Sequence, residues 1–335
     1  MGITIKDIAK KANVSYSTVS RALAGHNQIS NETKNRILKI SEELGYSPNT
    51  LAQGLVTKQT FNLGLIVSDI TNPFFPEVIQ GIEESANDLG YRIYLCNTNW
   101  SVEKENIYLN RLFTSSVDGI IIFPASDDVS HIINSKIKIP IVFANHKLKD
   151  DACSYVAFND YEAAKTAVEY LIKLGHKNIA YVGGLETNVS NMERIRGYQE
   201  VMKNHSIELH PNYIVNGEFK QSSGYQLTKD LLIKNAYPTA IVAGDDVMAL
   251  GVIQAVEEFG LNVPNDISVI GFDDISYAAL DKIQLTTINM PKYEMGKASI
   301  QLLMERIHEQ SKCKTKFKIL ETELILRKTC NGIRR

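Results

Sequence analysis

The chain of 335 residues is short of cysteine and of long apolar runs, and these shortages exclude several classes of protein. Its four cysteines lie far apart and include no Cys-x-x-Cys pair: Cys96, Cys153, Cys313 and Cys330. A disulfide framework or a zinc site is therefore not expected. No apolar run approaches the length of a membrane span, and the N-terminus begins with an amphipathic pattern rather than a signal peptide. We expect a cytoplasmic protein.

The motifs that would identify an enzyme are also missing. Gly183-Gly184 is not part of a Gly-x-Gly-x-x-Gly turn, and no Gly-x-x-x-x-Gly-Lys-Ser/Thr phosphate loop occurs. The chain has no nucleophile elbow and no His-Glu-x-x-His pair, and its carboxylates lack a paired-acid context. We expect no catalytic residue, no bound metal and no cofactor, since a fold alone does not confer catalysis.

The small net charge of -2 hides an uneven distribution. Before residue 61, basic side chains outnumber acidic ones by four, which leaves -6 for the remainder. The basic ones are Lys6, Lys10, Lys11, Arg21, Lys34, Arg36, Lys39 and Lys58, and the acidic ones are Asp7, Glu32, Glu42 and Glu43. A basic end on an acidic body favours binding to DNA phosphates, because contact with them releases counterions. Many solvated helices are equally basic, so the excess is weak on its own.

The first 45 residues predict three short helices. Apolar side chains recur at helical spacing at Ile5, Ile8, Ala9 and Ala12. The pattern breaks at 13–15, where Ser15 can act as the N-cap of a second helix. A third helix at about 31–44 would close a small core with Ile37, Leu38 and Ile40.

The second of these helices has two different faces. Its inward face carries Val19, Ala22 and Leu23. Tyr16, Ser17 and Arg21 fall on another face. Two helices joined by a short turn are typical of a helix-turn-helix, whose second helix enters the major groove of DNA. The sequence therefore predicts a DNA target that Tyr16, Ser17 and Arg21 are free to contact.

From residue 61, apolar strands alternate with amphipathic helices, as in parallel sheets covered on both faces. The first set has strands at 62–68, 92–96, 119–123, 140–144 and 154–158, and helices near 76–89, 102–115 and 128–134. The second set has strands at 179–182, 239–243 and 267–271, and helices near 160–174, 192–204, 222–233 and 245–259. Each set is too short for a full dinucleotide fold. The pattern predicts two lobes with a cleft where the strand ends meet.

Motifs spread along the chain resemble the signatures of the lactose/galactose-repressor family. They are the segment 4–21, Gly45-Tyr-Ser-Pro-Asn49, Asp69-Ile-Thr-Asn-Pro-Phe-Phe75, Val117-Asp-Gly-Ile-Ile121, Gly175-His-Lys-Asn-Ile179, Met248-Ala-Leu-Gly251, Val263-Pro-Asn-Asp266, Ile270-Gly-Phe-Asp-Asp274 and Leu285-Thr-Thr-Ile288. Because they follow the family's order over nearly the whole chain, chance resemblance is negligible.

The resemblance implies a particular division of the chain. An all-α helix-turn-helix DNA-binding domain at 1–47 would precede a hinge helix and linker at 48–60. The α/β body at 61–335 would resemble a two-lobed periplasmic sugar-binding protein. This body would bind the effector and form the dimer. Lobe one would comprise about 61–159 plus 290–319, and lobe two about 160–289 plus 320–335. The chain would cross between them near Asn159, Asn289 and Leu320.

The resemblance also implies roles for individual side chains of the first domain. At matching family positions Tyr16, Ser17 and Arg21 contact base edges, and Arg21 is the best candidate for a bidentate contact to guanine. Alternatively, Arg21 contacts only phosphate or caps the recognition helix. Hydroxyl and amide side chains that position the DNA backbone without reading sequence are expected at Thr4, Ser15, Thr18, Ser20 and Asn27.

The hinge should not fold alone. Pro48 suits the first turn of a short helix, because its missing N–H needs no partner there, but Gly54 costs roughly 1 kcal/mol relative to alanine. The hinge helix of a second subunit and DNA would supply the missing contacts. In the resembling family the equivalent of Leu55 wedges into the minor groove, so Asn49 and Leu55 are expected at the DNA. Leu55 could instead pack on the partner hinge, and Gln53 replaces an arginine that many members carry.

Polar and aromatic side chains at strand ends are candidates for a sugar site. They are Asp69, Phe74, Phe75, Ser126 and Asn145 in the first lobe, and Arg194, Phe219, Asp245 and Asp273 in the second. Matching family positions contact the effector, and the motifs around Arg194 and Asp273 align without a gap. Alternatives stay open: Phe74 or Phe75 can be plain core, and Asp245 can be a helix N-cap. Asn145 replaces an aspartate common in members that bind free sugars, and the neighbouring His146 is expected at the surface or the cleft rim.

These observations predict a ligand-gated transcription factor, a repressor that binds a pseudo-palindromic operator as a homodimer and is nucleoid-associated when bound. A small molecule, a sugar or sugar derivative, would shift the lobes and the hinge. The motif 69–76 is most similar to regulators of pentose uptake such as the ribose repressor. One alternative is a catabolite-control regulator gated by a phosphorylated carrier protein that docks near 91–108. A sugar-binding receptor is opposed by the DNA module. The absence of a leucine heptad after Arg327 favours a dimer over a tetramer.

Overall fold

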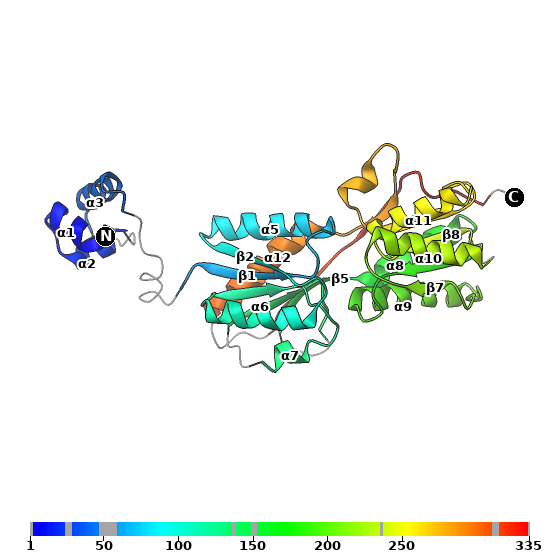
Figure 1. Cartoon of the computed structure of the whole chain (residues 1–335), viewed down its shortest axis with the longest axis horizontal. Coiled ribbons are helices and arrows are strands. Elements are labelled where there is room, and N and C mark those ends of the chain that lie inside the picture. Colours follow the sequence, from blue (N-terminus) through cyan, green and yellow to red (C-terminus); the bar gives the residue numbers. More distant parts are fainter. Residues whose placement is uncertain are drawn as a thin grey trace. The chain divides into compact units, whose positions relative to one another are not determined.

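The computed structural model of the chain describes residues 3–23, 29–46, 59–135, 139–148, 153–234, 237–309 and 315–333. They form two compact units, Met1–Thr60 and Phe61–Arg335 (Figure 1). Residues 48–58 of the predicted hinge and linker at 48–60, with Asn49 and Leu55, lie outside the described residues, as does the predicted DNA contact Asn27.

The first unit contains the three predicted helices, α1 (Ile5–Ala12), α2 (Tyr16–Leu23) and α3 (Asn31–Glu43). Ile8, Val19 and Ile37, one from each helix, are fully buried and form the centre of a small core. The prediction for Leu38 was wrong, because its side chain is 44% exposed. One residue along a helix turns the side chain by about 100°, so burial of Ile37 carries Leu38 toward solvent.

The first sheet of the body has the strand order β11-β5-β4-β3-β1-β2, and its strands pair in parallel. The strands are β1 (Asn62–Val67), β2 (Arg92–Asn97), β3 (Gly119–Ile122), β4 (Ile141–Ala144), β5 (Ser154–Phe158) and β11 (Phe317–Leu320). Helices α5 (Phe74–Asp88) and α12 (Lys292–Glu309) cover one face, and α6 (Val102–Thr114) and α7 (Ser130–Ile133) cover the other (Figure 1). Cover on both faces explains the nearly continuous apolar strands.

The second sheet repeats this plan, with the order β12-β10-β9-β8-β6-β7. Its strands are β6 (Ile179–Gly183), β7 (Ile214–Asn216), β8 (Ala240–Ala243), β9 (Ser268–Asp273), β10 (Thr286–Asn289) and β12 (Glu323–Ile325), of which β12 runs antiparallel to β10. Helices α8 (Asp160–Lys173) and α9 (Val189–Asn204) pack on one face, and α10 (Gln221–Ile233) and α11 (Asp246–Glu258) on the other. A short 3-10 helix, η1 (Ser276–Ala279), follows β9.

Close contact between α5 and α12 depends on two glycines. A Cβ at Gly81 would lie 2.2 Å from the Tyr293 carbonyl oxygen, and a Cβ at Gly296 would lie 2.3 Å from that of Val78. Only glycine fits where the two backbones approach so closely. This contact joins α12, from late in the sequence, to the first lobe.

The strand order places the candidate site. In each sheet the order reverses beside the first strand of the set, between β1 and β3 and between β6 and β8. Ligands of doubly wound sheets bind beyond the carboxyl ends of the strands at such points.

The predicted fold class, an all-α DNA-binding module followed by a two-lobed α/β body of parallel sheets, is confirmed. Cys96, Cys153 and Cys330 are free thiols, and Cys313 lies outside the described residues. Within those residues, no helix has the length and apolarity to span a membrane.

Candidate DNA-reading helix and effector cleft

The outer face of α2 is polar and open. Tyr16 is 61% exposed, and Ser17, Ser20 and Arg21 are also exposed. The opposite face holds α2 in place, because Val19 and Ala22 are buried against α1 and α3. The helix therefore presents its predicted reading residues together on one side.

Three hydroxyl groups meet at the start of α2. Ser15 Oγ accepts the Thr18 N–H at 3.1 Å, so the predicted N-cap is confirmed. The same oxygen lies 2.7 Å from Ser17 Oγ and 2.8 Å from Thr18 Oγ1. Thr4 similarly starts α1: its N–H and hydroxyl donate to Asp7 Oδ2 at 2.8 and 2.7 Å. These bonds to Thr4 hold the pKa of Asp7 below its usual value. Ser15 and Thr4 thus have a structural role, whatever they contact on DNA.

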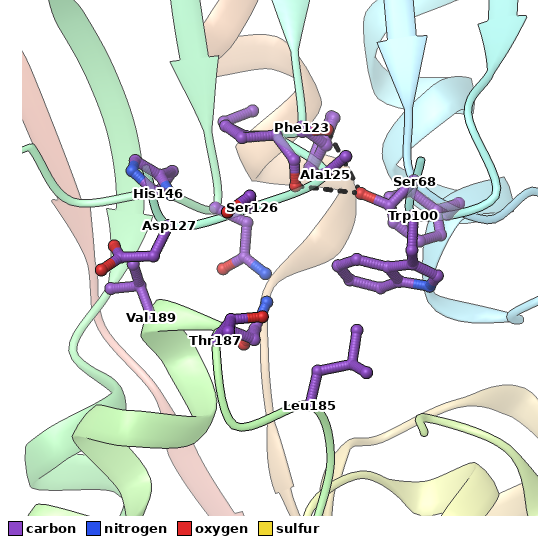
Figure 2. Close-up of a pocket in the computed structure, with 15 residues that line it drawn as sticks. Ser68, Trp100, Phe123, Ala125, Ser126, Asp127, His146, Leu185, Thr187 and Val189 are labelled. Atoms are coloured by element: carbon purple, nitrogen blue, oxygen red, sulfur yellow. Dashed lines mark hydrogen bonds between the residues drawn. The ribbon is translucent and has the colours of Figure 1, made fainter. Parts of the chain in front are cut away.

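In the body, loops after β1, β2, β3, β4 and β6 surround a cavity that is open to solvent, with about 400 Å³ of empty space including that solvent (Figure 2). The first lobe contributes Ser68, Phe75, Trp100, Ser126, Asp127, Asn145 and His146, and the second contributes Leu185, Thr187, Asn188 and Val189. Three predicted effector residues, Phe75, Ser126 and Asn145, therefore lie together. Asn145 and Val189 also line an adjoining hollow that is open to solvent, beside Asp160 and Glu193.

Asn145 carries a hydrogen-bond acceptor that is unpaired within the described part of the chain. Its Oδ1 is buried and has no hydrogen-bond partner within the described part of the chain. A buried acceptor without a partner is costly, and such atoms in native proteins need an explanation. A ligand that donates a hydrogen bond would supply one.

Arg194, Asp245 and Asp273 form a buried charged network in the second lobe. Arg194 is 3% exposed, and its Nε and Nη2 donate to Asp160 Oδ1 at 2.8 and 2.7 Å. Its Nη1 donates to the Gly244 carbonyl, and its guanidinium lies 4.4 Å from the ring centre of Phe272. Burial alone would lower the pKa of Arg194, but the Asp160 and Asp273 carboxylates outweigh it and raise that pKa. The arginine is thus charged and already bonded.

The two aspartates of this network are destabilised as anions. Burial raises the pKa of Asp273 to about 8, and Asp245 adds to the effect, while Arg194 and Lys292 oppose it. Burial also raises the pKa of Asp245. Asp245 Oδ1 accepts the Met248 N–H at 2.7 Å, so the alternative of a helix N-cap is confirmed for this residue.

Lys292 is a buried cation that sequence reasoning missed. It opens α12 and is 3% exposed. Its Nζ donates to the backbone carbonyls of Asp273 and Asp274, and it lies 3.4 Å from a carboxylate oxygen of Glu77. Its partners come from distant parts of the chain, so no local pattern could reveal it.

Other predicted residues have mixed surroundings. Phe74 and Phe75 are each 5% exposed and pack edge to face, with Phe158 and Phe123 as further neighbours. Phe74 does not line the 400 Å³ cavity and is core, whereas Phe75 belongs to both core and cavity. Asp69 Oδ1 accepts the Thr71 N–H and hydroxyl, so this carboxylate stabilises a local turn.

His146 is buried rather than at the surface. It is 6% exposed and lines the cavity beside Asp127 (Figure 2). Burial lowers its pKa to about 4, and the Asp127 carboxylate opposes this only partly. His146 is therefore neutral near pH 7.

Glu105, which sequence reasoning also missed, stabilises the loop after β3 that lines the cavity. It is fully buried on α6 and accepts the Ala125 N–H at 2.7 Å, within the loop that follows β3. His131 Nε2 lies 2.8 Å from its other oxygen. Burial raises the pKa of Glu105. This carboxyl group fixes the loop that carries Ser126 and Asp127.

Direct contacts join the two lobes across the cleft. Asn72 Nδ2 donates to Asp245 Oδ2 at 3.0 Å, and the Asp127 N–H donates to the Thr187 carbonyl at 3.2 Å. Trp100 stacks on Phe219, with ring centres 5.8 Å apart. Within the described residues, no group of three or more His, Cys, Asp or Glu side chains is placed to hold a metal ion.

Two family models match the chain. Residues 4–49 match "Bacterial regulatory proteins, lacI family", and residues 60–325 match "Periplasmic binding proteins and sugar binding domain of LacI family". The chain belongs to the LacI family. The resemblance stated from the motifs is thereby confirmed.

Known LacI-family proteins resemble the chain over almost its full length. Catabolite control protein A of Priestia megaterium is 36% identical over 313 residues, 93% of this chain and 94% of the relative. The HTH-type transcriptional repressor PurR of Pasteurella multocida (strain Pm70) is 34% identical over 328 residues, 97% and 98% of the two chains. The Lac repressor dimer bound to operator and the anti-inducer ONPF superposes with a TM-score of 0.90 at 28% identity, covering 99% of this chain and 100% of that one.

Membership of the LacI family confirms the predicted function. The protein is a DNA-binding transcriptional regulator of the repressor type, with an effector-binding body. The relatives named above are transcriptional regulators rather than enzymes. LacI-family regulators bind operator DNA and small-molecule effectors and act as dimers.

Proposed function

We propose that a neutral sugar binds in the cleft between the lobes and controls the affinity of the N-terminal module for operator DNA. The observation that carries the proposal is the buried Asn145 Oδ1, which lacks a partner among the described residues at the meeting point of both sheets. A sugar hydroxyl can donate to this oxygen, while Phe75 offers an apolar ring face. Ser126 and Asp127 add hydrogen-bonding groups.

The charges of the cleft favour a neutral ligand over an anionic one. The buried cations Arg194 and Lys292 are already bonded to acceptors of the protein. The buried carboxyl groups of Asp160, Asp245 and Asp273 offer no positive charge to a phosphate. A phosphate group would have to displace the acceptors that Arg194 and Lys292 already have. A neutral sugar, such as the pentose ribose, does not meet this obstacle.

The roles of individual residues follow from this arrangement. For the effector we propose Asp69, Phe75, Ser126, Asn145, Arg194, Phe219, Asp245 and Asp273, with Phe74 acting only by supporting Phe75. For DNA we propose base contacts from Tyr16, Ser17 and Arg21 and backbone contacts from Thr4, Ser15, Thr18 and Ser20, together with Asn27, Asn49 and Leu55. The exposed face of α2 supports the first group. The internal bonds of Asp69 and Asp245 require that a ligand share or replace them.

We propose that a homodimer couples the cleft to a pseudo-palindromic operator through the hinge at 48–60, which joins the DNA-binding domain at 1–47 to the body at 61–335. The Lac repressor that this chain resembles is a dimer bound to its operator. The second lobe exposes large apolar side chains that a second copy could cover, including Ile233, Tyr277 and Leu280. A ligand that binds one lobe orientation better would shift the hinge and the operator affinity together.

A thermal-shift panel of ribose, other neutral sugars, sugar phosphates and nucleobases tests the ligand. At about 100 times its dissociation constant, the effector should stabilise the protein by roughly 2.7 kcal/mol. A neutral sugar should raise the melting temperature in the wild type but not in Asn145→Ala, and its phosphate ester should have no effect. A response to sugar phosphates alone, or to no small molecule, would contradict the proposal.

Similarity to catabolite control protein A favours a second candidate, control by a phosphorylated carrier protein. Exposed side chains of lobe one support this candidate: Arg92, Tyr94 and Leu95 lie on the edge strand β2, and Lys104 lies on α6. Adding a phosphorylated carrier protein to the thermal-shift panel tests this candidate. Stabilisation by the carrier without any response to sugars would replace the leading proposal with this one.

A further inference from the structure

Trp100 joins the two lobes directly. It is the single tryptophan of the chain, and its ring stacks on Phe219 with an interplanar angle of 28°. Trp100 follows β2 in the first lobe, and Phe219 precedes α10 in the second. The stack therefore links two bodies whose relative movement is the proposed signal.

An uncommon backbone conformation places Trp100 at the cleft. Asn99 and Trp100 have φ angles of 50° and 59°, both in the left-handed region that disfavours side chains other than glycine. Hydrogen bonds to the end of β1 hold this turn: the Trp100 N–H donates to the Ser68 carbonyl at 3.1 Å, and the Thr98 N–H to that of Val67 at 2.9 Å. Such strained residues are frequent in ligand clamps and switches.

The other half of the stack packs against its own lobe. A Cβ built on Gly184, at the end of β6, would lie 2.2 Å from the Phe219 ring. The ring therefore lies directly on this glycine, and it also packs on the core of the second lobe. Both rings lie on loops, Trp100 after β2 and Phe219 between β7 and α10, but Phe219 packs on its own lobe whereas the Trp100 ring extends to the opposite one.

We propose that Trp100 is the movable wall of the effector cleft, closed against Phe219 and required to part from it when an effector enters or leaves. Trp100 lines the 400 Å³ cavity, and Figure 2 shows its indole facing Leu185 of the opposite lobe. The Asn72–Asp245 and Asp127–Thr187 hydrogen bonds close the cleft as well. This inference rests on the proposed function for the identity of the cleft as the effector site.

Tryptophan fluorescence of the full-length protein tests the contact between Trp100 and Phe219 without a ligand, because Trp100 is the single tryptophan of the chain. In Phe219→Ala the acrylamide quenching constant should rise about twofold or more, since the ring loses its stacking partner. Gly184→Ala should act in the same direction by displacing the Phe219 ring. Phe113→Ala, which removes a 44% exposed ring of α6, is the matched control and should leave quenching unchanged. Far-UV circular dichroism and melting curves verify that each variant folds.

Unchanged quenching in folded Phe219→Ala and Gly184→Ala would overturn the inference. A ligand supplies the second arm: a sugar that raises the melting temperature must also change Trp100 emission, and a thermal shift with unaltered emission would equally contradict a movable wall. If no sugar raises the melting temperature but quenching rises in the variants as expected, the proposed function is contradicted, while the closed contact between Trp100 and Phe219 is supported.

Discussion

The recognition helix and the effector cleft use polar side chains in opposite ways. On α2, Tyr16 and Arg21 are exposed, and the core on the other face of the helix holds them outward. In the cleft, Arg194 and Asp273 are 3% and 5% exposed, and the Arg194 guanidinium is already bonded to Asp160 and Gly244 without a ligand. Cleft residues thus have a second task, the stability of the body. Substitutions there should cost folding free energy, whereas substitutions on the exposed face of α2 should cost only DNA binding.

The largest expected effect is on stability, in Arg194→Ala. Removing the guanidinium leaves the buried Asp160 carboxylate without its partner, so the free energy of unfolding should fall by about 3–5 kcal/mol. Urea denaturation measures it. Arg196→Ala is the control on the same helix, because Arg196 is 58% exposed in its pair with Glu193 and should contribute at most about 1 kcal/mol. Equal losses in the two variants would remove the distinction.

A pH-dependent effect is expected next, at His146. Its pKa is about 4 in the folded protein against an ordinary 6.5, so the unfolded chain takes up a proton that the folded one refuses. Stability from this group is present above pH 6.5 and is lost as the pH falls toward 4, by up to about 3 kcal/mol. The difference between the urea midpoints at pH 7 and at pH 4.5 should be smaller in His146→Gln than in the wild type. An identical pH dependence in both proteins would show that this imidazole is not buried.

Arg21→Ala tests the recognition helix, where a substitution should affect DNA binding but not folding. The variant should lose about 1–3 kcal/mol of discrimination between the best duplex and its competitors. Its folding stability should change by less than about 0.5 kcal/mol, since the side chain is exposed. Competition binding against a randomised duplex library measures the preference. Lys39→Ala is the charge-matched control on α3 and should weaken all duplexes evenly. Unchanged preference in Arg21→Ala would make Arg21 a phosphate contact.

The smallest effect is expected at Ser15, an exposed residue with a structural task. Ser15→Ala removes the acceptor for the Thr18 N–H and should destabilise α2 by about 1 kcal/mol. Amide hydrogen exchange within α2 should therefore accelerate. Ser20→Ala, in the middle of the same helix, is the control and should leave exchange nearly unchanged. Equal exchange rates in the two variants would contradict the capping role.

Local pattern predicted much of the fold, and long-range contact decided the rest. Helical spacing and a serine cap predicted α1 and α2, and strand ends predicted the neighbourhood of Ser126 and Asn145. Strands β7, β10, β11 and β12 were not assigned: β7, β11 and β12 are edge strands without a buried apolar run, and β10 begins with two threonines. Trp100 was missed because no glycine marks its left-handed turn. The buried state of Lys292 depends on carbonyl groups 18 and 19 residues away, which only the folded body brings to it.

Operator affinity measured against effector concentration tests the central claim most directly. The duplex selected by the wild type is titrated by fluorescence anisotropy with and without a saturating amount of the sugar that raises the melting temperature. We predict that the dissociation constant for the operator changes by roughly 5–150-fold in the wild type and stays constant in Asn145→Ala. A sugar that stabilises the wild-type body but leaves its operator affinity unchanged would contradict a cleft that controls DNA binding.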